Sequence, residues 1–338
     1  MMSYAGLWRL GRVALALGFG CLLSRSADAQ VYRLAELNID QIRLLDRQRT
    51  VILLPGGVLE EHGPYLPSFA DGYRNERLAE DLAAAIAKRP GWAAVVFPMI
   101  PLGSDGANRM GGKYVFPGSY PIRTATLRAV FMDLASEFGE QGFRWLFVIH
   151  QHGSPNHNQA LDQAGDYFRD TYGGHMVNVT GLQRGPSAVD SILASQVSKS
   201  ALADDGFTVH AGLASHSQVM AMRPDLVPAA VANAPSVTGK DPADLMRIAA
   251  SEKWTGYFGA PRYASAALGR RLLETENREW VALALRILDG LDERQIPRYT
   301  ATPIAKSPDG IAVADANAKR DAAIEEQQRQ WLAKSGQR

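Results

Sequence analysis

The chain has 338 residues, of which 46% are hydrophobic and 21% charged, and its net charge is +1. These values are typical of a globular protein and exclude a disordered or collagen-like chain. The length allows one large α/β domain or two modest ones, and either could bury a core without disulfides.

The first 29 residues have the pattern of a secretory signal peptide. Two arginines precede an apolar run of 11 residues, Val13 to Leu23, and the Ala-Asp-Ala of residues 27–29 offers a cleavage site before Gln30. The run is shorter than the roughly 20 apolar residues of a spanning helix. We therefore expect export to the periplasm or secretion. An uncleaved anchor is the alternative, and lipidation at Cys21 is less favoured because the typical upstream leucine is missing.

Removal of residues 1–29 would leave 33 basic and 34 acidic side chains, a net charge of −1, and no cysteine. A chain with this net charge lacks the excess of basic side chains that nucleic-acid binding requires. We expect no nucleic-acid partner and no membrane contact after cleavage. A metal site would have to use histidine and carboxylate ligands, because no thiolate remains.

Strands and helices are predicted to alternate along the rest of the chain. Short apolar runs predict buried strands at 51–54, 93–97, 145–149 and 176–179, and helical spacing predicts helices at 74–88, 125–141, 158–172 and 266–291. This order predicts an α/β fold with three layers, in which helices flank a mostly parallel sheet. We expect one domain over 30–299 and a polar, charged tail over 300–338. The tail is predicted to be a solvated helix or a frayed end, with partner binding as the alternative.

The loop after the first predicted strand carries Glu60, His62 and Asp71 between glycines and prolines. A rigid loop of this kind can turn carboxylate and imidazole donors toward one divalent metal. A hydrogen-bonded surface turn is the alternative for this segment alone.

A second polar cluster follows the strand at 145–149. His150 and His152 would point the same way if the strand continued, so that one would face the site and the other would support it or contact substrate. A capped strand-to-helix turn, with Asn156 as the cap residue, is the alternative. Ligand sites in parallel sheets lie beyond the carboxyl ends of the strands, so we expect the two clusters to meet.

The sequence resembles the creatininase (creatinine amidohydrolase) family. The most specific motif is Pro-Gly-Gly-Val-Leu-Glu-Glu-His-Gly-Pro-Tyr-Leu-Pro at 55–67 with Asp71. Looser motifs follow in the family's order, at 103–104 (Gly-Ser), 116–119 (Phe-Pro-Gly-Ser), 152–156, 210–212 (His-Ala-Gly) and 256–261. The resemblance covers residues 45–290.

The resemblance implies a two-metal hydrolytic site, a small-molecule amide substrate and a homo-oligomer, often a hexamer. By position, Glu60 and His152 would hold one ion, His62 the other, and Asp71 would bridge them. The two divalent ions, Zn²⁺ or Mn²⁺, would activate a water for attack on the amide. His210 would handle the proton at the leaving nitrogen.

The remaining site residues follow from the same resemblance. Substrate contacts are expected from Ser104, His150 and Asn156.

The sequence departs from the family where a glutamate usually completes the second metal site. The positions that could supply it hold Ser154, Leu213 and Ser215. His216 lies next to them and is our candidate for the missing ligand, with a buried structural histidine as the alternative. The predicted function is an exported metal-dependent amidohydrolase that acts on a non-peptide C–N bond. The alternatives are a catalytically impaired binding protein with a partial metal site and a structural or assembly protein.

Overall fold

Five parallel strands form a single sheet in the computed structural model, which describes residues 30–185 and 187–336. The strands are β1 (Gln30–Arg33), β2 (Thr50–Pro55), β3 (Ala93–Val96), β4 (Trp145–Ile149) and β5 (His175–Asn178), in the spatial order β1-β3-β2-β4-β5. The four predicted strands agree with β2 to β5 within one residue at nearly every end. β1 was not predicted, and the predicted signal peptide with Cys21 lies outside the described residues.

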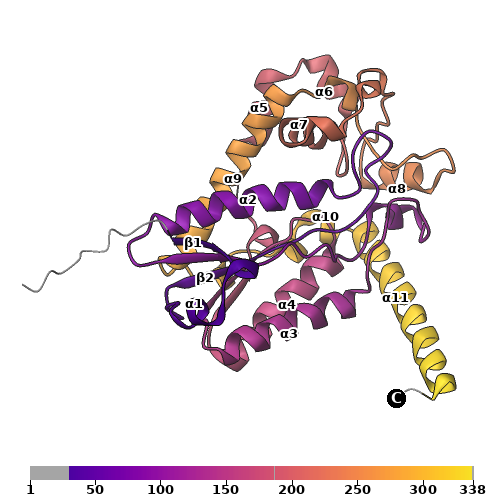
Figure 1. The fold of residues 1–338 in the computed structure, drawn as a ribbon. Coiled ribbons are helices and arrows are strands. Elements are labelled where there is room, and N and C mark those ends of the chain that lie inside the picture. The colour runs from indigo at the N-terminus through magenta and orange to yellow at the C-terminus, as the bar shows by residue number, and fades with distance from the viewer. Residues whose placement is uncertain (1–29, 186, 337–338) are drawn as a thin grey trace, which may run out of the picture.

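Helices cover both faces of the sheet (Figure 1). Those described are α1 (Ile39–Arg43), α2 (Ala70–Ala87), α3 (Thr124–Glu140), α4 (Pro155–Tyr172), α5 (Val189–Gln196), α6 (Lys199–Asp205), α7 (Leu213–Met222), α8 (Pro242–Ala250), α9 (Ala266–Leu288), α10 (Pro303–Lys306) and α11 (Pro308–Ser335). Helices α2 and α9 pack on one face, and α3 and α4 pack on the other. The predicted three-layer α/β fold is confirmed.

The central strand β2 shows why its sequence is apolar without interruption. Val51 and Leu53 belong to the core under α2 and α9, whereas Ile52 and Leu54 belong to the core under α3 and α4. Successive side chains of a strand point to opposite faces, so a strand with helices on both sides needs apolar residues at every position. A continuous apolar run is therefore the signature of this strand.

Helix α4 begins three residues before its predicted start. Ser154 is the N-cap residue and its hydroxyl oxygen accepts the His157 N–H, while Pro155 occupies the first helical position. Proline suits this position because its missing N–H would have no helical partner there. Asn156, the cap residue in the alternative given for this segment, lies inside the first turn.

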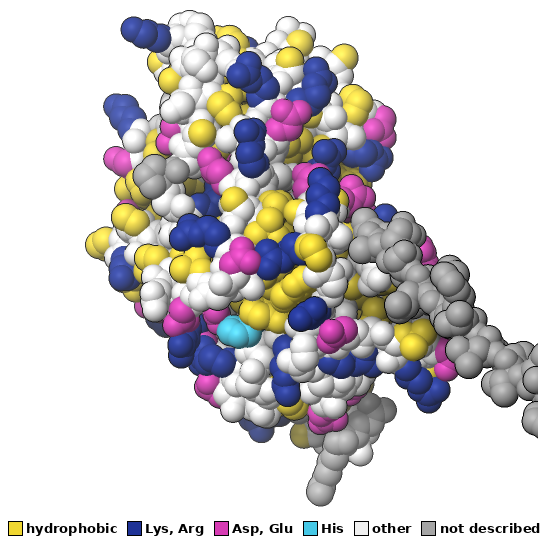
Figure 2. Space-filling model, turned by 90° about the vertical axis from the view of Figure 1, so that its left-hand side faces the viewer, with side chains coloured by type: hydrophobic (Ala, Val, Ile, Leu, Met, Phe, Trp, Pro, Cys, Tyr) yellow, Lys and Arg dark blue, Asp and Glu magenta, His cyan; other side chains and the backbone are white. Residues whose placement is uncertain are grey.

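The region predicted as a tail forms α10 and α11. Helix α11 leaves the body of the protein toward the C-terminus, as Figure 1 shows in yellow. Its earlier part is held by buried ion pairs described below. Among the described residues, no helix combines the length and the apolar character needed to cross a membrane. Figure 2 shows basic and acidic side chains intermixed over one face of the molecule, around a band of apolar side chains.

Candidate metal centre

A cavity of about 420 Å³ lies beyond the carboxyl ends of β2 and β4. The loop after β2 contributes Glu60 and His62, and the turn after β4 contributes His152. Asp71 enters from the first turn of α2, and His210 comes from the segment before α7. Residues from four separate parts of the chain thus meet at the sheet edge where ligand sites of parallel sheets occur.

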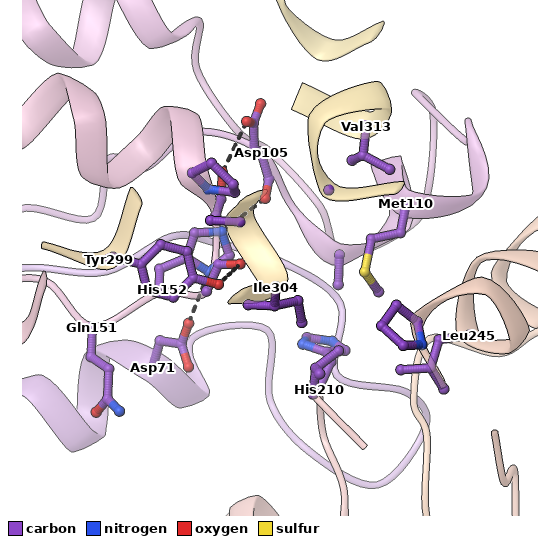
Figure 3. Close-up of a pocket in the computed structure, with 18 of the residues that line it drawn as sticks. Asp71, Asp105, Met110, Gln151, His152, His210, Leu245, Tyr299, Ile304 and Val313 are labelled. Atoms are coloured by element: carbon purple, nitrogen blue, oxygen red, sulfur yellow. Dashed lines mark hydrogen bonds and ion pairs between the residues drawn. The ribbon is translucent and has the colours of Figure 1, made fainter. Parts of the chain in front are cut away.

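The donor atoms of these five residues form two overlapping groups. Atoms of Glu60, Asp71 and His152 lie within 4.8 Å of one another, and so do atoms of Glu60, His62 and His210. His152 Nδ1 is 3.2 Å from Glu60 Oε1 and 3.4 Å from Asp71 Oδ2. The other Asp71 oxygen lies 3.7 Å from His62 Nε2, so the carboxylate of Asp71 faces both groups (Figure 3).

The three histidines are held in matching orientations. In each ring one nitrogen bonds a backbone carbonyl: His62 Nδ1 to Glu60 at 3.1 Å, His152 Nε2 to Asp105 at 2.8 Å, and His210 Nε2 to Glu61 at 2.6 Å. A carbonyl oxygen only accepts, so these nitrogens carry the protons. The opposite nitrogens face the carboxylates. This is the support that metal-binding histidines have in proteins. Burial opposes the charged form of these rings, but the carboxylates raise the pKa of His62 and of His152, so a metal ion would take the place of a proton there.

The electrostatics of the site favour a bound cation. Burial acts to raise the pKa of Asp71, but hydrogen bonds with His152 and His62 outweigh it and hold that pKa well below its usual range. Burial likewise opposes ionisation of Glu60, yet the charge of His152 and its hydrogen bond lower the pKa of Glu60. Two buried carboxylates therefore stay ionised at neutral pH. Oxygen and imidazole nitrogen donors of this kind suit zinc and manganese, so the residues present fit a divalent metal.

His210 occupies a place that the resemblance did not assign to it. Its Nδ1 lies 3.9 Å from Glu60 Oε1 and belongs to the donor group of His62. Burial lowers the pKa of His210 to about 4, so the ring is neutral at pH 7. A neutral imidazole with an inward lone pair can donate to a metal, which is a different role from the predicted proton transfer.

His216 lies fully buried on α7 and belongs to neither donor group among the described residues. Its Nδ1 bonds the Gly212 carbonyl at 3.0 Å, and burial lowers its pKa to about 4. The segment before α7 places the ring of His210 beside that of His62, whereas His216 lies within the helix. The geometry therefore favours the structural alternative for His216.

The three predicted substrate contacts do not line the cavity. His150 is fully buried, and its Nδ1 pairs with His157 Nε2 at 3.2 Å. The strand ends at Ile149, so the two-residue alternation that would align His150 with His152 no longer holds.

Ser104 and Asn156 also lie outside the cavity lining. The backbone N–H of Ser104 donates to His157 Nδ1, and Asn156 Nδ2 donates to the Ala314 carbonyl. The structure thus gives Asn156 a supporting contact where a substrate contact was predicted, whereas the buried Ser104 hydroxyl has no hydrogen-bond partner among the described residues.

The three positions where the family could have a glutamate have other roles or lie apart from the donor groups. Ser154 caps α4 and donates its hydroxyl proton to the Asp105 carboxylate at 2.9 Å, and Leu213 is buried in a core cluster. Ser154 and Ser215 line the cavity, whereas Leu213 does not. None of them offers a carboxylate to the donor groups.

Asp105 is a site residue that sequence reasoning missed. Its φ of 61° lies in the left-handed region, which turns its carbonyl toward His152. Its carboxylate pairs with Arg109 Nη1 at 3.0 Å. Aspartate is one of the few residues that adopts this conformation readily, so the Gly-Ser-Asp-Gly sequence at 103–106 was the available signal.

The fold and the donor set together define an α/β protein with a carboxylate and imidazole metal site. The chain matches the family model "Creatininase: Creatinine amidohydrolase" over residues 35–284. It therefore belongs to the creatininase family.

Individual relatives support this assignment. A stretch of 102 residues is 30% identical to the creatinine amidohydrolase of Pseudomonas putida, covering 30% of this chain and 37% of that relative. The match thus spans little more than a third of the curated relative. The solved structure described as "Creatininase Mn" has a TM-score of 0.58 and 21% identity, covering 76% of this chain and 99% of that one. A mutant creatininase of Zn-Zn type has a TM-score of 0.53 and 21% identity, covering 75% and 97%. At these identities the solved structures show the fold.

Proposed function

We propose that this protein is a metal-dependent amidohydrolase that cleaves a cyclic or linear non-peptide C–N bond in a small molecule. The observation that carries the proposal is the matching orientation of His62, His152 and His210. In each ring one nitrogen is hydrogen-bonded to a backbone carbonyl and the other is directed at Glu60 or Asp71. Membership of a family described by creatinine amidohydrolase supports the same reaction class.

Two divalent ions, Zn²⁺ or Mn²⁺, would be held by the two donor groups. One ion would be held by Glu60, Asp71 and His152. The other ion would be held by His62 and His210 together with Glu60. When bound, such ions polarise an amide carbonyl and bring the pKa of a coordinated water toward neutrality.

The chain prepares the donors before any ligand arrives. Glu60 Oε2 accepts the Ala107 N–H at 2.7 Å, which leaves Oε1 directed at His152. Arg74, whose Nη1 lies 4.0 Å from Asp71, is itself held by Gln151 and Glu276. Fixed partners of this kind reduce the reorganisation needed when substrate binds.

The proposal is tested by hydrolysis assays on purified protein supplied with Zn²⁺ or Mn²⁺. Creatinine, unsubstituted lactams and linear amides form one set of substrates, and the same compounds with apolar substituents form another. We expect turnover of at least one amide that is lost on chelation and restored by metal. Binding of metal without turnover of any amide would contradict the proposal.

A binding protein with an impaired site is the second candidate. It is favoured by one observation, which is that Ser154, Leu213 and Ser215 leave the donor groups without the additional family carboxylate. Such a protein would bind an amide or its analogue at the metal site without converting it. Calorimetric binding with no product formed would support this candidate.

Export and assembly are also proposed. The N-terminal pattern supports cleavage before Gln30 and a periplasmic or secreted protein, and the resemblance supports a homo-oligomer, with a hexamer as the expected size. N-terminal sequencing of protein from the periplasmic fraction tests the cleavage site. Light scattering of the purified protein tests the oligomer.

A further inference from the structure

The C-terminal segment contributes one wall of the metal-site cavity, although it lies outside the family match. That match ends at residue 284, whereas Ile304 of α10 and Val313 of α11 line the cavity. Figure 3 shows Met110, Leu245 and Val313 on one side of the cavity, opposite the polar side chains that include Asp71 and His152.

The side of the cavity away from the donors carries a group of apolar side chains, next to the polar Ser307, Asp309 and Asn317. We call the following six lining residues the apolar wall: Met110, Phe207, Val209, Leu245, Ile304 and Val313. Phe207 and Val209 are 38% and 45% exposed, which is unusual for large apolar side chains next to a polar site. A ligand that covered them would remove apolar surface from water.

The C-terminal part of this wall is fixed to the domain by buried contacts. On α11, Asp321 accepts from Arg109 Nη1 at 3.2 Å and from the Thr124 N–H at 2.7 Å. The Ala314 carbonyl accepts from Asn156 Nδ2 at 2.9 Å. Asp321 and Arg109 are both buried, so this part of the helix is packed as an element of the fold. The wall is therefore in place before substrate arrives.

We propose that residues 303–317 make this site selective for amides that carry an apolar substituent, in preference to a compact polar amide such as creatinine. The proposal rests on the amidohydrolase function proposed above. With the reacting amide at the metal donors, an attached apolar group would lie against Ile304 and Val313. The cavity volume of about 420 Å³ falls in the range of roughly 300–1,000 Å³ found for small-molecule sites, which leaves room for such a group.

The test compares two hydroxamic acids, because hydroxamates chelate metals and the pair differs only in its apolar group. Acetohydroxamic acid and benzohydroxamic acid are titrated calorimetrically into the full chain supplied with Zn²⁺. The double variant Ile304→Thr with Val313→Thr keeps a β-branched shape at both positions while adding a hydroxyl. The control is Ile311→Thr, because Ile311 is 50% exposed on the same helix and does not line the cavity.

We expect the unaltered protein and the Ile311 control to bind benzohydroxamic acid at least about tenfold more tightly than acetohydroxamic acid. The double variant should lose most of this ratio while its affinity for acetohydroxamic acid and its melting temperature change little. Equal affinities in the unaltered protein, an unchanged ratio in the double variant or failure to bind either acid would overturn the proposal. Amide turnover is measured separately, so a protein that shows the ratio but no turnover would refute the amidohydrolase function and leave the apolar selectivity standing.

Discussion

His152 donates its Nε2 proton to the backbone carbonyl of Asp105 across 2.8 Å. This bond directs His152 Nδ1 between Glu60 and Asp71, where a metal ion would take the place of its proton. The carbonyl reaches His152 because Asp105 adopts a left-handed conformation, and the Asp105 side chain is in turn anchored by Arg109. Support of this kind sets both the tautomer and the direction of a ligand.

Replacement of the central carboxylate should abolish metal binding without unfolding the protein. Asp71→Asn keeps the size of the side chain but removes the charge that faces both His62 and His152. We expect metal affinity to fall at least about 100-fold and turnover to disappear, since even supporting residues of metal sites contribute 10- to 100-fold. Metal per chain is measured by mass spectrometry after dialysis. Glu80→Gln, an exposed change on the same helix, is the control and should retain its metal.

The roles of the two nearby histidines can be separated by metal content. His210→Ala should lower the number of ions bound per chain, because His210 Nδ1 belongs to a donor group. His216→Ala should retain the ions and lose about 2 kcal/mol or more of stability, because it removes a fully buried side chain. Loss of metal in the His216 variant would restore the role expected from sequence. Full metal content with no turnover in the His210 variant would instead indicate proton transfer.

The buried ion pair of α11 should be important for stability. Asp321→Ala removes the partner of both Arg109 and the Thr124 N–H. Arg109 keeps its pair with Asp105, but it loses one charge-assisted hydrogen bond and the Thr124 N–H loses its acceptor, so we expect a loss of about 2 kcal/mol. Denaturant unfolding measures this loss, and hydrogen exchange should show faster opening of α11. Asp315→Ala, an exposed change on the same helix, should have little effect on either measurement.

The raised pKa of Asp162 predicts how the free energy of unfolding depends on pH. Burial raises its pKa to about 6, whereas an unfolded aspartate titrates near about 3.9. Between these values the folded protein binds more protons than the unfolded chain, so this group lowers the free energy of unfolding as the pH rises. Asp162→Asn should therefore stabilise the protein above about pH 7 by on the order of 2 kcal/mol, and by much less near about pH 4.

The matched control for this prediction is Asp166→Asn. Hydrogen bonds from Arg298 lower the pKa of Asp166, so this change should destabilise the protein at neutral pH. Denaturant unfolding across the pH range distinguishes the two variants. If the free energy of unfolding had the same pH dependence in the unaltered protein and the Asp162 variant, Asp162 would be ionised in the folded protein at neutral pH.

The sequence by itself determined the layers of the fold and its family. Strands such as Val51 to Leu54 are apolar at every position because both sides of the sheet are buried, and helices such as α9 carry apolar residues at helical spacing. Both signals are local, so they can be read without knowing what packs against them. The motif at 55–67 is local as well, and it carried the resemblance that the family match confirms.

Only the tertiary structure decided which donors meet. His210 and His216 lie in one short segment and look equivalent in sequence, but the start of α7 places one beside His62 and turns the other into the core. The role of Asp105 depends on a backbone dihedral, and the wall formed by Ile304 and Val313 depends on contacts of α11 with residues about 200 positions earlier. Such long-range placements are set by packing and buried ion pairs across the whole domain, which no local pattern encodes.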